Sequence, residues 1–504
     1  MKKYILIILC CLTSFPLWSY NVNMIVEHYS VDQGLPNNTV NCTLKDRDGF
    51  IWFGTWYGLC CFDGVKFKTF NKQEHDSDVP PRKIQRIVED KNGYIWVKTI
   101  DRKLYVFNKV TECFHAVYDD MKNYSENIQV IKLQNTAEGD VLLLTKDKNL
   151  LLAGVDEKGQ VTIKILFDSR NEINKHDYTL KHHVLCETEE YISWIGTDYK
   201  VAAVHKGSEL ASRPADFITS KINSGDKDSF TSFFEDGRKV WVGDRAGIFY
   251  SIDVRTGLVN RYVLSEIKGA ISNLLVTPAG YVYLSVAGQG TYEYDLAERR
   301  LQKINTEMND AMVTHAFIDQ YDKIWFHENE KALIYYDPLN HTAKRFPFTM
   351  FGKITTLYSE DAGERGLFFL SPAGEAWLFD REHAEMVYIN KLKQLSNDRA
   401  NQQFYHLMLD NDGVLWLSSA DEGVYCMNFP KKQFNLLSLS PQSVGQENYA
   451  TGVRALFQSK SGDIWVGTRW QSVYRMDRNG VTKHVFSTGD EHIGNVYHIM
   501  EDDK

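Results

Sequence analysis

One stretch decides the fold of this chain: Gly49-Phe50-Ile51-Trp52-Phe53-Gly54-Thr55. It returns almost unchanged as Gly462-Asp463-Ile464-Trp465-Val466-Gly467-Thr468, and more loosely as Ser193-Trp194-Ile195-Gly196-Thr197. Weaker copies lie between these three, so the stretch recurs about every 40 to 50 residues, a period typical of repeat architectures. One such unit cannot bury its own apolar face, and neighbouring units must therefore stack against each other.

Each copy contains four short segments of alternating polarity that are separated by turn residues. In the first copy these segments are 40–44, 50–54, 59–62 and 66–70, with Asp46-Arg47-Asp48-Gly49 after the first and Asp63-Gly64 after the third. Gly and Asp suit tight hairpins, because they tolerate positive φ or cap the backbone. Four antiparallel strands in about 45 residues make one propeller blade. The sequence therefore predicts an all-β chain of β-propeller repeats with four-stranded blades.

A large apolar residue occupies the tryptophan position of every copy. These anchors are Trp52, Trp96, Leu142, Trp194, Trp241, Tyr283, Trp325, Phe368, Trp416 and Trp465. Burial of such a side chain against a neighbouring blade contributes roughly 1.5 to 3 kcal/mol, so we interpret the anchors as structural.

The number of copies exceeds one ordinary ring, since propellers usually have about four to eight blades. We therefore predict one complete seven-bladed β-propeller over residues 24–345 and the first three to four blades of an incomplete second β-propeller over 346–504. The last residues, from Gly494 to Lys504, are interpreted as the first strand of an eleventh copy. The chain is thus expected to stop within a blade.

Residues 1–19 have the layout of a secretory signal peptide. Lys2 and Lys3 precede an apolar run from Tyr4 to Leu12, which is followed by Pro16 and the small residue Ser19. An uncleaved membrane anchor is the alternative. No later segment has the roughly 18 consecutive apolar residues of a membrane-spanning helix, so we expect an exported, periplasmic chain. The net charge of −9 disfavours nucleic acid as a partner, and we expect no cofactor.

The start of the mature chain resembles one family closely. The resemblance rests on His28-Tyr29-Ser30-Val31-Asp32-Gln33-Gly34-Leu35-Pro36-Asn37-Asn38, on the stretch from Asp46 to Thr55, and on Gly58-Leu59 with Phe62-Asp63-Gly64. These motifs are similar to the two-component regulator propeller repeats of periplasmic sensors in hybrid two-component systems. In that family, two seven-bladed propellers precede an immunoglobulin-like β-sandwich, a membrane helix and cytoplasmic kinase, receiver and DNA-binding domains.

The resemblance implies that this chain is the sensor region of such a system, truncated before the β-sandwich, membrane and kinase domains. It implies an oligosaccharide from polysaccharide breakdown as ligand, a homodimer through the parent protein, and membrane attachment only through the missing C-terminal part or an uncleaved signal. No phosphoacceptor histidine motif or ATP-binding glycine motif occurs, so we expect no enzyme activity. Two alternatives stay open, since propellers host all three functions. One is a carbohydrate lyase or hydrolase with acid and base groups on the channel face, and the other is a structural interaction scaffold.

The turn after each Gly-Thr varies between copies and is our candidate for ligand binding. Its predicted ligand-binding residues are Trp56, Tyr57, Arg102, Tyr199, Arg245, Gln289, Asn329, Arg469 and Trp470. An aromatic face can stack on sugar C–H groups, and planar polar side chains can bind hydroxyls. Ordinary solvated turns are the alternative interpretation.

The acidic turns resemble fragments of calcium loops but lack the closing Glu at the twelfth position. The 15 histidines show no metal-binding spacing. We therefore expect neither a metal site nor catalytic residues.

Overall fold

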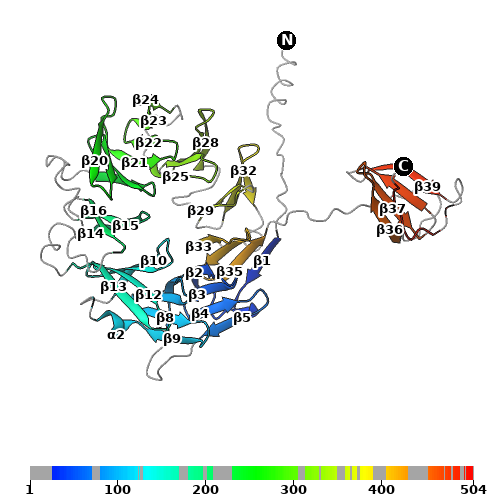
Figure 1. Ribbon diagram of the computed structural model, residues 1–504, viewed down its shortest axis with the longest axis horizontal. Helices are drawn as coiled ribbons and strands as arrows, with labels where there is room; N and C mark the ends of the chain where they lie inside the picture. Colours follow the sequence, from blue (N-terminus) through cyan, green and yellow to red (C-terminus); the bar gives the residue numbers. More distant parts are fainter. Residues whose placement is uncertain are drawn as a thin grey trace, which may run out of the picture. The chain divides into compact units, whose positions relative to one another are not determined.

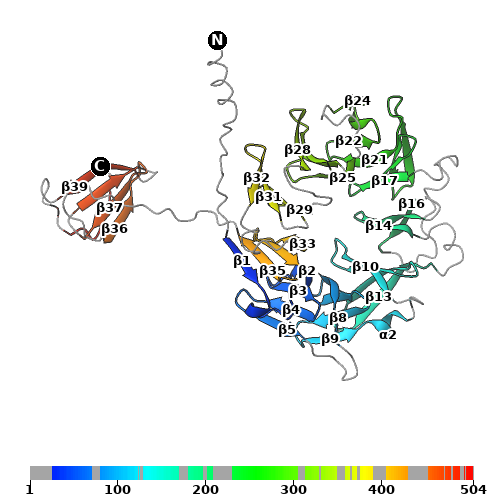
Figure 2. The same cartoon turned by 180° about the vertical axis from the view of Figure 1, so that it is seen from behind.

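The computed structural model describes residues 25–70, 80–122, 124, 129–169, 180–196, 201–207, 230–304, 313–328, 331–348, 358–363, 366–371, 375–389, 404–428, 452–469, 472–477, 481–487, 493 and 495–502. The predicted signal peptide, residues 1–19, lies outside this part. The described chain is built almost entirely of β-strands (Figures 1 and 2). It divides into two compact units, residues 1–429 and 430–504. The all-β fold of four-stranded propeller blades is therefore confirmed.

The described strands of the first unit form nine antiparallel sheets, which we call blades 1 to 9. Blade 1 contains β2 (Val40–Lys45), β3 (Ile51–Thr55), β4 (Gly58–Phe62) and β5 (Phe67–Phe70). Blade 2 contains β6 (Ile84–Glu89), β7 (Ile95–Thr99), β8 (Leu104–Asn108) and β9 (Cys113–Ala116). Blade 3 contains β10 (Val130–Asn135), β11 (Val141–Thr145), β12 (Leu150–Val155) and β13 (Val161–Phe167). Blade 4 contains β14 (Leu180–Glu187), β15 (Tyr191–Gly196) and β16 (Val201–His205).

The next blades follow the same order along the chain. Blade 5 contains β17 (Phe230–Glu235), β18 (Lys239–Asp244), β19 (Ile248–Asp253) and β20 (Leu258–Val263). Blade 6 contains β21 (Ile271–Val276), β22 (Tyr281–Val286), β23 (Gly290–Asp295) and β24 (Arg300–Lys303). Blade 7 contains β25 (Val313–Ile318), β26 (Ile324–Glu328), β27 (Ala332–Asp337) and β28 (Thr342–Pro347). Blade 8 contains β29 (Tyr358–Asp361), β30 (Leu367–Leu370), β31 (Ala376–Asp380) and β32 (Glu385–Ile389).

Blade 9 and the second unit complete the set of described sheets. Blade 9 contains β33 (Phe404–Leu409), β34 (Leu415–Ser419), β35 (Val424–Asn428) and the N-terminal strand β1 (Ile25–Tyr29). The second unit holds one sheet of β36 (Val453–Gln458), β37 (Ile464–Thr468), β38 (Ser472–Met476) and β39 (Thr482–Ser487). The described helical segments are the 3₁₀ turn η1 (Val31–Gln33) and the short helix α2 (Tyr118–Met121).

The nine blades form a closed ring (Figures 1 and 2). The first strand of each blade is innermost, since β2 lies against β6, β17 against β21 and β29 against β33. β1 pairs antiparallel with β35, from Ile25 opposite Asn428 to Tyr29 opposite Val424. Blade 9 then packs on blade 1, where the rings of Trp416 and Phe53 lie 5.8 Å apart. The N-terminal strand therefore closes the ring.

This closure differs from the sequence prediction in two ways. The units divide after residue 429 instead of residue 345, and nine described sheets share the first unit, so a seven-bladed ring is not confirmed. The physical reason is the pairing of β1 with β35, which ties residues 404–428 to the start of the chain. A hydroxyl contact of 2.7 Å between Thr43 and Ser418 adds to the same joint.

Blade packing explains the glycine of the repeated stretch. A Cβ added at Gly54 would lie 2.6 Å from Cγ2 of Ile84, the first residue of the next inner strand. In the second unit, a Cβ at Gly467 would lie 2.6 Å from Cγ1 of Val496. Val496 thus occupies the position that Ile84 takes in blade 2. This contact is the one expected if residues 494–504 begin a further blade.

An aspartate six residues before the tryptophan fixes both the hairpin turn and the indole. Asp46 Oδ2 accepts a hydrogen bond from Trp52 Nε1 at 2.8 Å, while Oδ1 accepts from the backbone N–H of Asp48 and Phe50. The same bond joins Asp90 to Trp96, Asp319 to Trp325 and Asp410 to Trp416.

The anchors differ in how fully they are covered. Those of the first unit are at most 5% exposed, and Trp465 in the second unit is half-buried. Where the anchor is Tyr283, its hydroxyl donates to the buried Glu293 instead.

Candidate functional site

The two ends of the strands define two faces of the first unit. The turns between second and third strands, which carry the predicted ligand-binding residues, lie at one end, called here the second-turn face. The turns between first and second strands, and between third and fourth strands, lie at the other end, called here the acidic-turn face. This division follows from the antiparallel order of the strands within each blade.

Trp56 and Tyr57 lie in the turn between β3 and β4 and present their rings to solvent. Their side chains are 42% and 62% exposed. Lys83 Nζ lies 5.2 Å from the centre of the Trp56 ring. The Lys83 N–H donates to the Trp56 carbonyl at 2.9 Å, and the Ile100 N–H donates to the Lys83 carbonyl at 2.9 Å. The predicted turns of blades 1 and 2 are therefore neighbours on the second-turn face.

Arg102 lines a pocket of about 400 Å³ at the outer part of blade 2. It has a positive φ of 68°, and its carbonyl accepts a hydrogen bond from Val130 of blade 3. The lining combines charged, amide and aromatic side chains: Asp101, Arg102, Lys103, Tyr105, Tyr118 and Gln129, with Leu104, Ala116, Val117 and Met121. This volume lies within the range of small-ligand sites, and the mixture of groups suits a sugar.

The other predicted ligand-binding residues do not join this pocket. Arg245 is exposed in the turn between β18 and β19. Gln289 stabilises a loop, because its Oε1 accepts from the Lys268 N–H at 2.7 Å and its Nε2 donates to the Glu266 carbonyl at 3.2 Å. Arg469 is exposed in the second unit. The remaining three, Tyr199, Asn329 and Trp470, lie outside the described residues.

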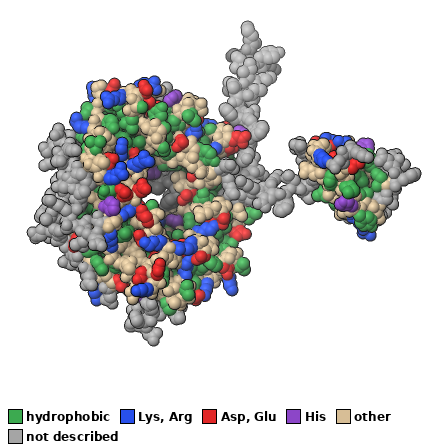
Figure 3. Space-filling model, in the orientation of Figure 1, with side chains coloured by type: hydrophobic (Ala, Val, Ile, Leu, Met, Phe, Trp, Pro, Cys, Tyr) green, Lys and Arg blue, Asp and Glu red, His purple; other side chains and the backbone are tan. Residues whose placement is uncertain are grey.

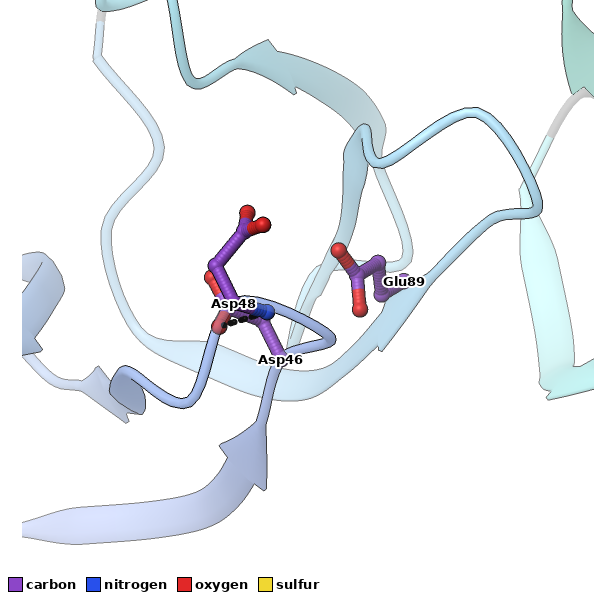
Figure 4. A group of neighbouring side chains, drawn as sticks. All are labelled: Asp46, Asp48 and Glu89. Carbon is purple, nitrogen blue, oxygen red and sulfur yellow. Dashed lines mark hydrogen bonds between the residues drawn. The ribbon is translucent and has the colours of Figure 1, made fainter.

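The acidic-turn face holds a larger groove, of about 850 Å³, between blades 1 and 2. Asp46 and Asp48, on the turn after β2, line this groove. Their carboxylate oxygens and that of Glu89, at the end of β6, lie within 4.8 Å of one another (Figure 4). Lys109 Nζ lies 3.0 Å from Asp46, 2.7 Å from Asp48 and 2.8 Å from Glu89. The Lys109 ammonium therefore occupies the position between the three carboxylates that a metal ion would need.

The pKa values of Lys109 and Asp48 respond to their contact. Burial alone lowers the pKa of Lys109, but hydrogen bonds to Asp48, Glu89 and Asp46 outweigh burial and raise it above its ordinary value. The hydrogen bond and charge of Lys109 in turn lower the pKa of Asp48. We call this arrangement the inter-blade clamp, because it joins the first turn of one blade to the next blade.

The clamp recurs at two other joints of the ring. Between blades 3 and 4, Lys206 Nζ lies 2.8 Å from Glu138 and 2.5 Å from Glu187. Between blades 7 and 8, the Arg381 guanidinium lies 2.6 Å from Asp319 and 2.7 Å from Asp361. In each clamp the basic residue follows the third strand of the later blade.

Our sequence reasoning missed these clamps, although a signal exists. An acidic residue ends the first strand of the later blade, and a Lys or Arg follows about 20 residues further on, as with Glu89 and Lys109. The end of the first strand and the end of the third strand lie on the acidic-turn face of the same blade, so this spacing brings the two charges together.

The match to a known family lies in blade 1. Residues 34–57 match the Two component regulator propeller family. The chain thus carries a two-component regulator propeller repeat, as the resemblance predicted. No curated protein matches the sequence.

Three solved structures illustrate the likeness in fold. The extracellular domain of a hybrid two-component system from B. thetaiotaomicron is 15% identical with a TM-score of 0.32, and the match covers 94% of this chain and 68% of that one. The extracellular domain of a one-component system from the same organism is 17% identical with a TM-score of 0.28, covering 94% and 63%. The Dos1 propeller is 12% identical with a TM-score of 0.42, covering 80% and 94%. The chain spans about two thirds of the length of the two extracellular domains.

Within the described residues, no helix is long and apolar enough to cross a membrane.

Proposed function

We propose that this chain is the exported ligand-recognition part of a two-component sensor, and that it binds oligosaccharides without transforming them. The observation that carries the proposal is the match of residues 34–57 to the Two component regulator propeller family. The second-turn face supports it, because the pocket at Arg102 combines planar polar groups with the rings of Tyr105 and Tyr118. Tyr118 is 56% exposed and is therefore accessible to a ligand.

Calorimetric titration of the mature chain with a panel of oligosaccharides tests the proposal. We expect one structural class to bind, and Arg102→Ala to weaken that binding by about tenfold, since a hydrogen bond to a charged group contributes about 1.5–3 kcal/mol. Arg261→Ala is the matched control, because Arg261 is an exposed arginine on the outer strand β20 and is not a predicted ligand-binding residue. Release of new reducing ends or unsaturated sugars from any glycan would overturn the non-catalytic proposal.

Export has a separate test. We expect the N-terminus of the chain recovered from the periplasm of a Gram-negative host to follow Ser19, as read by mass spectrometry. A chain that retains Lys2 and Lys3 and stays with the membrane fraction would contradict cleavage.

A further inference from the structure

The inner wall of blades 2 and 3 gathers basic side chains. Arg86 on β6 lies directly opposite Lys98 on β7 in the antiparallel register. Like charges at directly opposite positions of an antiparallel pair are destabilising. Lys98 Nζ reaches into blade 3, where it donates to the Ile131 carbonyl, and Lys132 is the next residue on β10. The fold therefore brings at least three cationic side chains to neighbouring positions.

Lys98 is the most constrained of these cations. It is only 7% exposed. Burial lowers its pKa, and the positive charges of Arg102 and Arg86 lower it further. Burial of an ammonium is costly, and the charged neighbours that act on Lys98 carry the same sign.

Arg86 extends this positive field around the ring. Its charge acts on Cys42 in blade 1 and on His406 in blade 9, where burial and then Arg86 lower the histidine pKa to about 4. Both residues lie on innermost strands, β2 and β33. Charged and histidine side chains also surround the central hollow of the first unit (Figure 3). Arg86 thus lies, like Cys42 and His406, on an innermost strand, β6.

We propose that the inner wall of blades 2 and 3 binds an oxyanion, such as a carboxylate, sulfate or phosphate group, between Arg86 and Lys98. The guanidinium of Arg86 offers paired N–H donors that match the oxygens of such a group. Lys98 supplies a buried positive charge on the neighbouring strand. Arg102, whose charge also acts on Lys98, lines the 400 Å³ pocket, whereas Arg86 and Lys98 do not line it. Such a site could bind an anion whether or not the chain senses oligosaccharides.

Calorimetry of the full chain at low ionic strength tests the proposal. The probes are sodium glucuronate, sulfate and phosphate, and glucose is the matched neutral control. We expect saturable binding of at least one anion and none of glucose. Arg86→Gln and Lys98→Met should each weaken binding by about tenfold or more. The matched controls are Arg261→Gln and Lys344→Met, exposed cations on the outer strands β20 and β28, and these should bind as the wild type does.

Stability gives a second readout that separates a binding site from a structural one. If Arg86 and Lys98 repel each other, Arg86→Gln should fold and should unfold at the same or a higher temperature than the wild type in the absence of anion. Binding of glucuronate alone would assign the site to a sugar acid, and binding of sulfate or phosphate alone to a free or esterified oxyanion. The proposal is overturned if none of the three anions binds, or if Arg86→Gln retains wild-type affinity.

Discussion

Lys109 and Lys98 are two largely buried lysines of the same blade, with opposite surroundings. The Lys109 side chain is 18% exposed and contacts three carboxylates. Lys98 contacts a backbone carbonyl and has Arg86 and Arg102 as its charged neighbours. Burial lowers the pKa of both lysines, but only the carboxylates at Lys109 reverse that effect. The carboxylates at Lys109 should therefore stabilise the joint between the blades, whereas the like charges around Lys98 should destabilise the inner wall.

The largest expected effect comes from removing the cation of the first clamp. Lys109→Met leaves Asp46, Asp48 and Glu89 close together without a counter-charge, so the free energy of unfolding should fall by about 3 kcal/mol. Equilibrium unfolding in urea at neutral pH measures this loss. Lys68→Met is the matched control, because Lys68 pairs with Glu112 at an exposed position, where an ion pair contributes about 0.5 kcal/mol. Equal losses in the two variants would show that the clamp does not join the blades.

The clamp between blades 7 and 8 should show the same behaviour with a smaller effect. Arg381 bridges two carboxylates, Asp319 and Asp361, instead of three. We expect Arg381→Met to lower the free energy of unfolding by about 2 kcal/mol, and Arg381→Lys to recover part of the loss, since an ammonium keeps the charge but not the fork of donors. A variant Arg381→Lys as unstable as Arg381→Met would mean that charge alone contributes little, and that the fork of donors or the packing on Tyr321, at 4.4 Å, carries the effect.

The strands, turns and anchors within each blade could be predicted from the sequence, but contacts between residues far apart in the chain could not. The repeated Gly-x-Ile-Trp-x-Gly-Thr pattern is local, so strands, turns and anchors could be predicted from it. Ring closure could not, because β1 and β35 are about 400 residues apart and each blade edge has the same hydrogen-bonding pattern.

The candidate site shows the same limit. Arg102 was predicted from its turn, but its neighbours Tyr118 and Gln129 come from the connection between blades 2 and 3. Arg86 and Lys98 were not predicted, because a single charged residue on a strand looks like an ordinary solvated position until its opposite partner is known. Only the pairing register of β6 with β7 shows that Arg86 and Lys98 lie opposite each other.

Acidification should reduce the difference in unfolding free energy between the wild type and Lys109→Met. Lys109 lowers the pKa of Asp48 in the folded wild type. Its contribution to stability is therefore complete above the ordinary aspartate pKa of about 4 and is lost as pH falls through the lowered folded value. In Lys109→Met the three adjacent carboxylates repel one another, which raises their pKa values, and protonation relieves that repulsion.

We accordingly expect the difference in unfolding free energy between the two proteins to shrink as pH falls from 7 to below 4, where the contribution of Asp48 is lost. Urea unfolding of both proteins at several pH values measures the gap. A gap that stays constant or widens on acidification would contradict the electrostatic origin of the clamp.

The smallest expected effect on stability belongs to the second-turn face. Trp56 is 42% exposed and contacts Lys83 through its ring, so Trp56→Ala should change the free energy of unfolding by less than about 1 kcal/mol. If this face binds oligosaccharides, the same variant should still weaken binding, because the lost ring removes a stacking surface. Trp52→Ala is the contrasting variant, since Trp52 is buried and bonded to Asp46, and it should lose about 3 kcal/mol or more. If Trp56→Ala instead lowers stability and leaves binding unchanged, Trp56 has a structural role like the anchors. The second-turn face of blade 1 would then not be a binding face.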